Sequence, residues 1–244
     1  MNLRKLKAIV FDLDGVLTDT SKVHMQAWMK AISEYEKSIN LPIASEFSDF
    51  DYERLLSGRS RISGLYKVSV DRGWPDKSLS LIDEIANNKN KYFLREINKR
   101  TADQLLFADA VRFLNRIAGK NIKFGLCSSS KNARLLLNAA NLADFFDDIV
   151  DGNDEGEFGI RSKPHPDPFD LSLSRLGVSG DDSMIVEDSE AGVRAALNSF
   201  ASVVVFLNRN EMSVSENPKI FSELRRSEKE VFIIKNFDEL GNVN

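Results

Sequence analysis

Short apolar stretches recur along the chain, and a pattern typical of an amphipathic helix follows most of them. They cover residues 8–11, 122–127, 147–150, 183–187 and 201–207. The first four end at polar residues, whereas the fifth has no polar group of chemical interest at its end. Apolar strands that alternate with amphipathic helices predict a parallel sheet covered on both faces. We therefore predict an α/β fold with a Rossmann-like, three-layer α/β/α core.

Helical spacing predicts which side chains of the intervening helices face this sheet. After the second apolar stretch one stripe consists of Leu135, Ala139 and Leu142, and after the fourth one stripe consists of Val193, Ala196, Leu197 and Phe200. Gly177 suits the end of the helix that begins near the prolines of "SKPHPDP". Residues 208–228 are polar and predict irregular chain, and "EVFIIKNFDEL" predicts a last strand.

Residues 19–99 break the alternation, because they contain helical patterns and no convincing strand. The helical patterns cover residues 21–35, 46–73 and 79–97. An all-helical block between the first and second strands predicts an inserted domain that covers the edge of the sheet. We therefore predict a core domain made of residues 1–18 and 100–244, and a helical cap domain made of residues 19–99.

The polar residues at the ends of the apolar stretches are the candidate functional groups. They are Asp12 and Asp14, Ser128, Lys163, and Glu187 with Asp188. Taken singly, each has an ordinary structural explanation: a turn, a helix cap, a solvated lysine or acids at a helix N-terminus. Taken together, they occupy equivalent places. The carboxyl ends of parallel strands lie on one edge of a sheet, where ligands bind.

Phosphoryl transfer through an aspartyl phosphate is the chemistry that needs this set. Asp12 would be the covalent nucleophile, and a Mg²⁺ ion held by Asp12, the backbone carbonyl of Asp14 and Asp188 would offset its repulsion from the phosphate. Lys163 would neutralise further charge, and Ser128 would donate a hydrogen bond to a phosphoryl oxygen. Asp14 would act as general acid and base on the leaving or entering oxygen.

Four segments of the chain carry a resemblance to a known family. "DLDGVLTDT", "LCSSSKN", "SKPHPD" and "VEDSEAG" together resemble the four motifs of the haloacid dehalogenase-like superfamily, and they are most similar to its β-phosphoglucomutase branch. The resemblance implies an aspartyl-phosphate mechanism with Mg²⁺ and a helical cap. It also implies that Glu187 and Asp188 lie at the metal, with Asp12 and Asp14 as nucleophile and acid/base.

The same resemblance suggests substrate contacts outside the four strand ends. In the cap they are His24, Arg61 and Lys89, with Arg61 as a clamp for a second, non-reacting phosphate; in the core they are Ser130, Lys131 and Asn132. Each also has a structural explanation, as a solvated or satisfied side chain or as part of a capped helix start. One position departs from the family pattern, because Gly64 stands where the family has a serine before leucine. This departure removes one hydroxyl from the expected substrate loop.

These residues favour a phosphosugar mutase, with a phosphosugar phosphatase as the alternative. A signalling receiver domain and a catalytically silent binding protein are competing hypotheses from other classes; the receiver predicts a shorter chain without a helical insert. The net charge of −4 gives no support for nucleic-acid binding, and no apolar run is long enough to span a membrane. With Cys127 as the single cysteine, we predict a cytoplasmic protein that binds a small phosphosugar and Mg²⁺.

Overall fold

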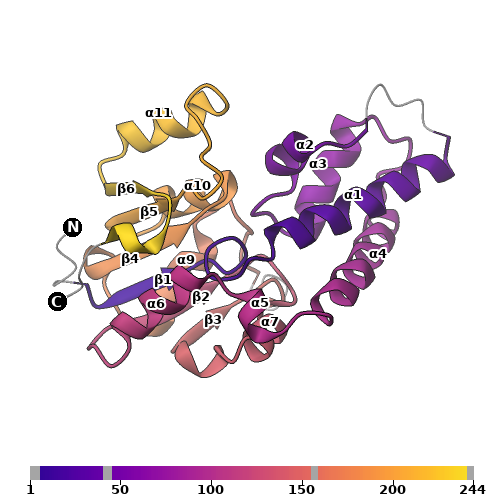
Figure 1. Cartoon of the computed structure of the whole chain (residues 1–244). Helices are drawn as coiled ribbons and strands as arrows, with labels where there is room; N and C mark the ends of the chain where they lie inside the picture. The colour runs from indigo at the N-terminus through magenta and orange to yellow at the C-terminus, as the bar shows by residue number, and fades with distance from the viewer. Residues whose placement is uncertain (1–5, 41–45, 155–158, 241–244) are drawn as a thin grey trace.

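A six-stranded parallel sheet forms the centre of the structure, a computed structural model that describes residues 6–40, 46–154 and 159–240. The strand order is β3-β2-β1-β4-β5-β6, so that the first strand lies in the middle (Figure 1). The strands are β1 (Ala8–Phe11), β2 (Lys123–Cys127), β3 (Asp148–Val150), β4 (Ser183–Glu187), β5 (Val203–Leu207) and β6 (Glu230–Ile234). The predicted α/β fold with a parallel sheet is confirmed, and so is the predicted last strand.

The register of the three central strands brings their carboxyl ends level. Phe11, the last residue of β1, lies opposite Leu126 of β2 and Val186 of β4. Strands β2 and β4 each extend only one residue beyond the level of Phe11. The side chains that follow the three strands therefore meet at one edge of the sheet. Asp12 therefore emerges between the loops that follow β2 and β4.

Alternate residues of each strand serve the two faces of the sheet. In β1, Ile9 and Phe11 belong to the core cluster on one face, and Ala8 and Val10 belong to the cluster on the other. The helices that cover these faces are α6 (Ala108–Ile117), α7 (Ala133–Ala139), α9 (Asp167–Leu176) and α10 (Glu190–Asn198). Apolar residues on both sides explain why the strands read as continuous hydrophobic runs.

The face of α7 that packs on the core differs from the predicted one. Leu135 and Ala139 are exposed, and the buried positions of the helix are Ala133, Leu136 and Leu137. Both sets have helical spacing, and the path of the chain after β2 decides which of them faces the sheet. Phe200 was also predicted to share the buried stripe of α10, but it lies beyond the end of that helix and is exposed.

The segment predicted to be irregular contains a helix, α11 (Pro218–Arg226). Asn217 caps its start by accepting a hydrogen bond from the backbone N–H of Ile220. Only Ile220, Phe221 and Leu224 of this helix are buried, and most of its other residues are charged or polar. The apolar stripe is therefore too narrow to stand out in the sequence.

The helices that follow β1 and precede α6 form a layer of their own beside the carboxyl edge of the sheet (Figure 1). They are α1 (Ser21–Ser38), α2 (Asp49–Leu55), α3 (Arg61–Asp71), α4 (Leu79–Ile97) and the short α5 (Ala102–Leu105). A separate hydrophobic cluster, which includes Trp28, Leu65 and Trp74, holds α1 to α4 together. We call α1 to α4 the helical layer.

Two chain segments join the helical layer to the sheet, and they are hydrogen-bonded to each other. The N–H of Asp19 donates to the carbonyl of Leu105, and the N–H of Phe107 donates to the carbonyl of Leu17. The N-terminal part of α1 and the C-terminal part of α4 also reach the main core. Val23 and Ala27 of α1, and Phe93 and Ile97 of α4, pack in the same cluster as residues of β1.

The predicted division into domains at residues 19 and 99 stays a prediction. Residues 1–5, 155–158 and 241–244 of the predicted core domain and residues 41–45 of the predicted cap domain lie outside the described residues. In the part of the chain that the structure describes, none of the helices combines the length and the apolar character that a membrane crossing needs.

Candidate active site

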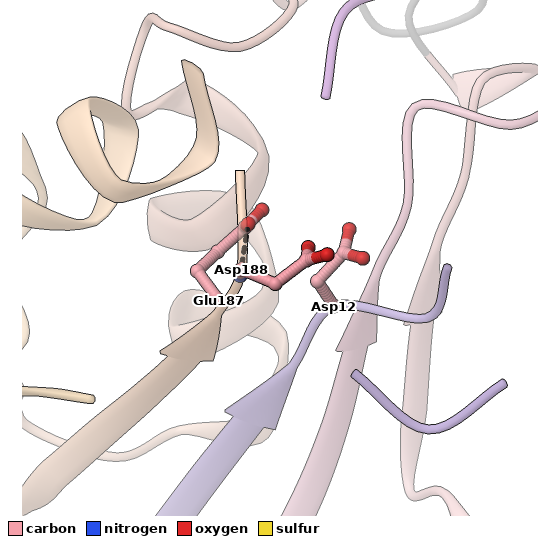
Figure 2. Close-up of side chains that lie close together, drawn as sticks. All are labelled: Asp12, Glu187 and Asp188. Carbon is pink, nitrogen blue, oxygen red and sulfur yellow. Dashed lines mark hydrogen bonds between the residues drawn. The ribbon is translucent and has the colours of Figure 1, made fainter. Parts of the chain in front are cut away.

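Three carboxylates meet where β1 and β4 end. Asp12, Glu187 and Asp188 each place one carboxylate oxygen within 4.8 Å of the others (Figure 2). Asp12 is the first residue after β1, and the other two are the last residue of the neighbouring strand β4 and the residue after it. The parallel pairing of these strands brings together groups that are far apart in the sequence.

Lys163 lies between these acids and is buried. Its Nζ donates to Asp12 Oδ1 at 2.6 Å, to Glu187 Oε1 at 2.6 Å and to the carbonyl of Cys127 at 2.9 Å. Burial alone would lower the pKa of Lys163, but the attraction of the two carboxylates outweighs burial and raises the pKa above its usual value. Lys163 is therefore held as a cation by all three of its partners.

One lysine does not offset three carboxylates. Burial, with repulsion from Glu187 and Asp14, raises the pKa of Asp12 to about 8, although Lys163 acts in the opposite direction. Burial and repulsion from Glu187 and Asp12 also raise the pKa of Asp188 well above its usual range. A group of buried oxygen donors with excess negative charge fits a hard divalent cation such as Mg²⁺.

Two glycines leave room for this cluster. A Cβ on Gly15 would lie 1.9 Å from Asp188 Oδ2, and a Cβ on Gly192 would lie 1.8 Å from Glu187 Oε1. Gly15 also has a φ of +91°, a conformation that other residues rarely adopt. The present positions of the Asp188 and Glu187 carboxylates therefore depend on the absence of a side chain at Gly15 and Gly192.

Asp14 lies beside the cluster but faces the helical layer. Its Oδ1 accepts a hydrogen bond from Thr20 Oγ1 and lies 3.3 Å from Nε2 of His24 on α1. Burial would raise the pKa of Asp14, but His24 and Thr20 together lower it. Asp14 is therefore ionised at neutral pH, whereas burial favours the protonated form of Asp12.

His24 connects Asp14 to a buried lysine of α4. The Nζ of Lys89 lies 2.7 Å from His24 Nδ1, and it also lies over the rings of Trp28 and Phe93 at 5.2 and 4.7 Å. Burial and the nearby positive charge of Arg61 lower the pKa of Lys89 to about 7. This lysine is packed among apolar side chains, with its amine directed at the histidine.

A pocket between the sheet edge and the helical layer brings most of the predicted residues together. Its walls include Asp12, Asp14, Asp188, Ser128 and Ser130 from the sheet side, and His24, Lys89 and Arg61 from the helical layer. Ser128 Oγ accepts from the N–H of Ser130 at 3.1 Å, and Ser130 Oγ accepts from the N–H of Asn132 at 3.2 Å. Ser129 Oγ donates to the carbonyl of Gly58 at 3.0 Å and joins the two sides of the pocket.

Four of the predicted residues do not line the pocket: Lys163, Glu187, Lys131 and Asn132. Lys163 lies behind Asp12 rather than on the surface of the pocket, which is consistent with its three short contacts. Lys131 is exposed, and it contributes its backbone carbonyl to Asn153 at 3.2 Å. The structure therefore does not bring the Lys131 side chain to the other candidate residues.

Sequence reasoning missed two polar residues of the helical layer. Tyr52 of α2 is buried and lines the pocket, where burial, Glu53 and the more distant acids raise the pKa of its hydroxyl. Asn90 of α4 accepts hydrogen bonds from both Arg61 and Asn132. Tyr52 lies in an ordinary amphipathic pattern that gives no sign of a pocket residue, whereas Asn90 directly follows the predicted Lys89 in the sequence.

Comparisons with known proteins identify the family of this chain. A family model described as haloacid dehalogenase-like hydrolase matches residues 6–199. A β-phosphoglucomutase of Bacillus subtilis is 36% identical over 191 residues, which cover 78% of each chain. A phosphorylated carbohydrates phosphatase of Thermotoga maritima is 29% identical over 198 residues, 78% of this chain and 80% of that one. The crystal structure of a β-phosphoglucomutase from Clostridium difficile has a TM-score of 0.74 and 27% identity, and the alignment covers 97% of this chain and 93% of that one.

Proposed function

Because this chain belongs to the haloacid dehalogenase-like hydrolase family, we propose that it transfers a phosphoryl group of a small phosphosugar through a phosphorylated Asp12, as a mutase of the β-phosphoglucomutase type. The observation that carries the proposal is that one pocket holds two carboxylates whose surroundings shift their pKa values in opposite directions. Asp12 lies against Lys163 and two further acids, and Asp14 lies two residues on against a histidine.

Asp12 is suited to the role of nucleophile. One carboxylate oxygen attacks phosphorus, the bond from phosphorus to the ester oxygen breaks, and its electron pair stays on the departing sugar oxygen. Lys163 donates to Asp12 Oδ1, and this contact fixes the orientation of the carboxylate and leaves Oδ2 for the attack. Ser128, which directly follows β2 and lines the pocket, would donate a hydrogen bond to a phosphoryl oxygen.

Asp14 is suited to move the proton. In its ionised form it accepts the proton of the hydroxyl that attacks the phosphorylated Asp12, and it returns that proton to the departing oxygen in the opposite transfer. His24 and Thr20 hold the carboxylate toward the helical layer, on the side from which a sugar hydroxyl would enter. The two acids therefore keep separate roles because their surroundings shift their pKa values in opposite directions.

The donor set fits Mg²⁺, with Asp12 and Asp188 as carboxylate ligands and the Asp14 carbonyl as a further ligand. Glu187 is already engaged, because Oε1 accepts from Lys163 and Oε2 accepts from the N–H groups of Asp188 and Ser189. We therefore assign Glu187 to holding the Asp188 loop. When bound, Mg²⁺ would supply positive charge that offsets the repulsion between the phosphate and these acids.

A phosphosugar phosphatase is the second candidate, supported by the relative from Thermotoga maritima that carries this activity in its name. The two reactions differ in what attacks the phosphorylated Asp12: a sugar hydroxyl or water. The receiver hypothesis is wrong, because it predicted a shorter chain with no helical insert after the first strand, where α1 to α4 form a layer of their own. A cytoplasmic location stays a prediction.

The test is a coupled assay on β-glucose 1-phosphate with Mg²⁺. We expect glucose 6-phosphate to form, and we expect a chelator or the substitution Asp12→Asn to stop it. Release of free phosphate without glucose 6-phosphate would replace the mutase by the phosphatase. Turnover that Asp12→Asn leaves unchanged would contradict both candidates.

A further inference from the structure

Arg209 contacts the loop that carries Asp14, although it comes from a distant part of the chain. It is the second residue after β5, the strand for whose end the sequence indicated no polar group of chemical interest. Its Nε donates to the carbonyl of Gly15 at 3.1 Å, and its Nη2 donates to the carbonyl of Val16 at 3.1 Å. In the sheet β4 lies between β1 and β5, so these hydrogen bonds join the loops of two strands that do not pair with each other.

The two carbonyls that Arg209 contacts belong to buried residues. Gly15 and Val16 are both buried, and a buried backbone carbonyl needs a hydrogen-bond donor. A guanidinium carries its N–H groups in one rigid plane, so one side chain satisfies both carbonyls and fixes the orientation of both peptide units. A lysine ammonium on its flexible stem would not fix two peptide units in this way.

The guanidinium is itself held by the segment that returns from the helical layer to the sheet. Nη1 donates to Oδ1 of Asp109 at 3.1 Å, and Nη2 lies 3.0 Å from Oδ2 of the same residue. The guanidinium carbon lies 3.9 Å from the centre of the Phe107 ring. Asp109 Oδ2 also accepts from the N–H of Phe237 at 2.8 Å. Asp109 balances the charge of Arg209, so this arginine is suited to hold segments of the chain rather than to bind an anion.

The loop held by Arg209 is the one on which the candidate site depends. Gly15 directly follows Asp14, which lines the pocket together with Asp12. Gly15 also lies against Asp188, because a Cβ on it would lie 1.9 Å from Asp188 Oδ2. A rotation of the peptide units at Gly15 and Val16 would therefore displace Asp14 relative to the other two acids.

We propose that Arg209 is a positioning residue, which holds the loop after β1 so that Asp14 keeps its place beside Asp12. The proposal rests on the proposed function and adds to it a residue outside the pocket walls on which the site depends. Arg209 acts through both polar groups of Asp14. It aligns the backbone carbonyl that we assign to Mg²⁺ and the carboxylate that we assign to proton transfer.

The test compares Arg209→Lys with Arg112→Lys. Arg112 of α6 makes an exposed ion pair with Asp238 and lies outside the pocket walls, so it offers the same substitution in another arginine–aspartate pair. Calorimetric titration of the substrate-free protein with Mg²⁺ measures binding without turnover. We expect about tenfold weaker Mg²⁺ binding for Arg209→Lys, because residues that orient metal ligands contribute about 10- to 100-fold to metal affinity. We expect Arg112→Lys to bind Mg²⁺ like the unaltered protein.

Steady-state kinetics separate positioning from a loss of stability. A variant that is only less stable stays folded in the absence of denaturant, so its Mg²⁺ affinity and its kcat do not change. With saturating Mg²⁺ and β-glucose 1-phosphate, we expect Arg209→Lys to lower kcat about tenfold and to leave KM unchanged. The reason is that the substitution displaces Asp14 and leaves the side chains of the helical layer in place.

A second variant keeps the test decisive if Arg209→Lys does not fold, which circular dichroism would show. Asp109→Asn removes the charge that holds the guanidinium but keeps an oxygen that can accept from the N–H of Phe237. We expect it to weaken Mg²⁺ binding in the same direction by a smaller factor, about threefold. If Arg209→Lys is unfolded, unchanged Mg²⁺ affinity in Asp109→Asn would overturn the proposal.

The remaining outcomes separate this proposal from the proposed function. Unchanged Mg²⁺ affinity in folded Arg209→Lys would overturn the positioning role whatever its kcat, and so would equal weakening in Arg112→Lys or no Mg²⁺ binding by the unaltered protein. Weaker Mg²⁺ binding in Arg209→Lys, with no phosphosugar converted by the unaltered protein, would keep the positioning role and contradict the mutase. Conversion by the unaltered protein, with normal Mg²⁺ binding in Arg209→Lys, would keep the mutase and contradict the positioning role.

Discussion

The two sides of the pocket carry opposite electrostatic imbalances. On the sheet side three carboxylates surround one lysine, and burial with mutual repulsion raises the pKa of Asp12 to about 8. In the helical layer Lys89 and Arg61 have no carboxylate at ion-pair distance among the described residues, and burial with like charge lowers the pKa of Lys89 to about 7. In both places burial favours the neutral form of the group.

The difference indicates what each side of the pocket is built to bind. The sheet side has excess negative charge and fits a cation, and the helical layer has excess positive charge and fits an anion. A phosphorylated substrate together with Mg²⁺ would balance both sides at once. Substitutions on either side of the pocket test this contrast, and we expect the largest effect on the sheet side.

Removal of Lys163 should disrupt the sheet side most strongly. Lys163→Met leaves Asp12 and Glu187 buried without their shared cation, so we expect loss of turnover and a fall of about 3–5 kcal/mol in the free energy of unfolding. Urea unfolding in a chelator measures this fall. Asp12→Asn is the matched control, since it also stops turnover but leaves Lys163 in place beside Glu187. An equal loss of stability in both variants would contradict the charge argument.

The stability of the metal-free protein should depend on pH through Asp12. Between pH values of about 4 and 8 the native carboxyl keeps a proton that the unfolded chain has lost, so stability falls as pH rises. The slope from one such group is at most about 1.4 kcal/mol per pH unit. Thermal unfolding in a chelator should show this fall, and Asp12→Asn should reduce it. A slope that is identical in both proteins would contradict the assignment to Asp12.

A smaller change tests whether the position of Glu187 matters. In Gly192→Ala the new Cβ would lie 1.8 Å from Glu187 Oε1, so the carboxylate must shift and release the Asp188 loop. We expect about 10- to 100-fold weaker activation by Mg²⁺, measured as the concentration that gives half-maximal rate. Shortening the acid in Gly192→Ala/Glu187→Asp should recover part of the loss. Unchanged activation in the single variant would argue against the role of Glu187.

The smallest expected effect is on the helical layer. Lys89→Met removes a buried charge, so we expect the substrate-free protein at pH 6 to gain about 1 kcal/mol of stability while its KM for substrate rises. In the unaltered protein Lys89 loses its proton at lower pH when folded than when unfolded, so stability should rise with pH above about 7. Lys89→Met should flatten that rise in thermal unfolding. A loss of stability at pH 6 would show that the charge of Lys89 is compensated.

The candidate acids could be predicted from the sequence because the signal for each of them is local. Asp12 directly follows an apolar strand, and Glu187 ends another. A parallel sheet places such ends on one edge whatever the details of side-chain packing. The pairing of Lys163 with two of these acids follows from the same rule, although its place behind Asp12 does not.

The contacts across the pocket could not be predicted in the same way. The exposed face of α7, the buried stripe of α11 and the meeting of Asn90 with Arg61 and Asn132 depend on how whole elements rotate and pack. A helical pattern states that one face is apolar, but it does not state what lies opposite that face. Lys131 shows the limit of motif matching, because it lies within a matching segment and its side chain is exposed.

The parallel sheet, the helical insert and the acids at the strand ends were therefore determined by the sequence, since each depends on neighbouring residues and on the handedness of parallel connections. The tertiary structure alone decided how the helical layer sits over the sheet and which of its side chains reach the pocket. That arrangement depends on contacts between residues distant along the chain, and no local pattern encodes them. The imbalance of charge between the two sides became visible only once these contacts were known.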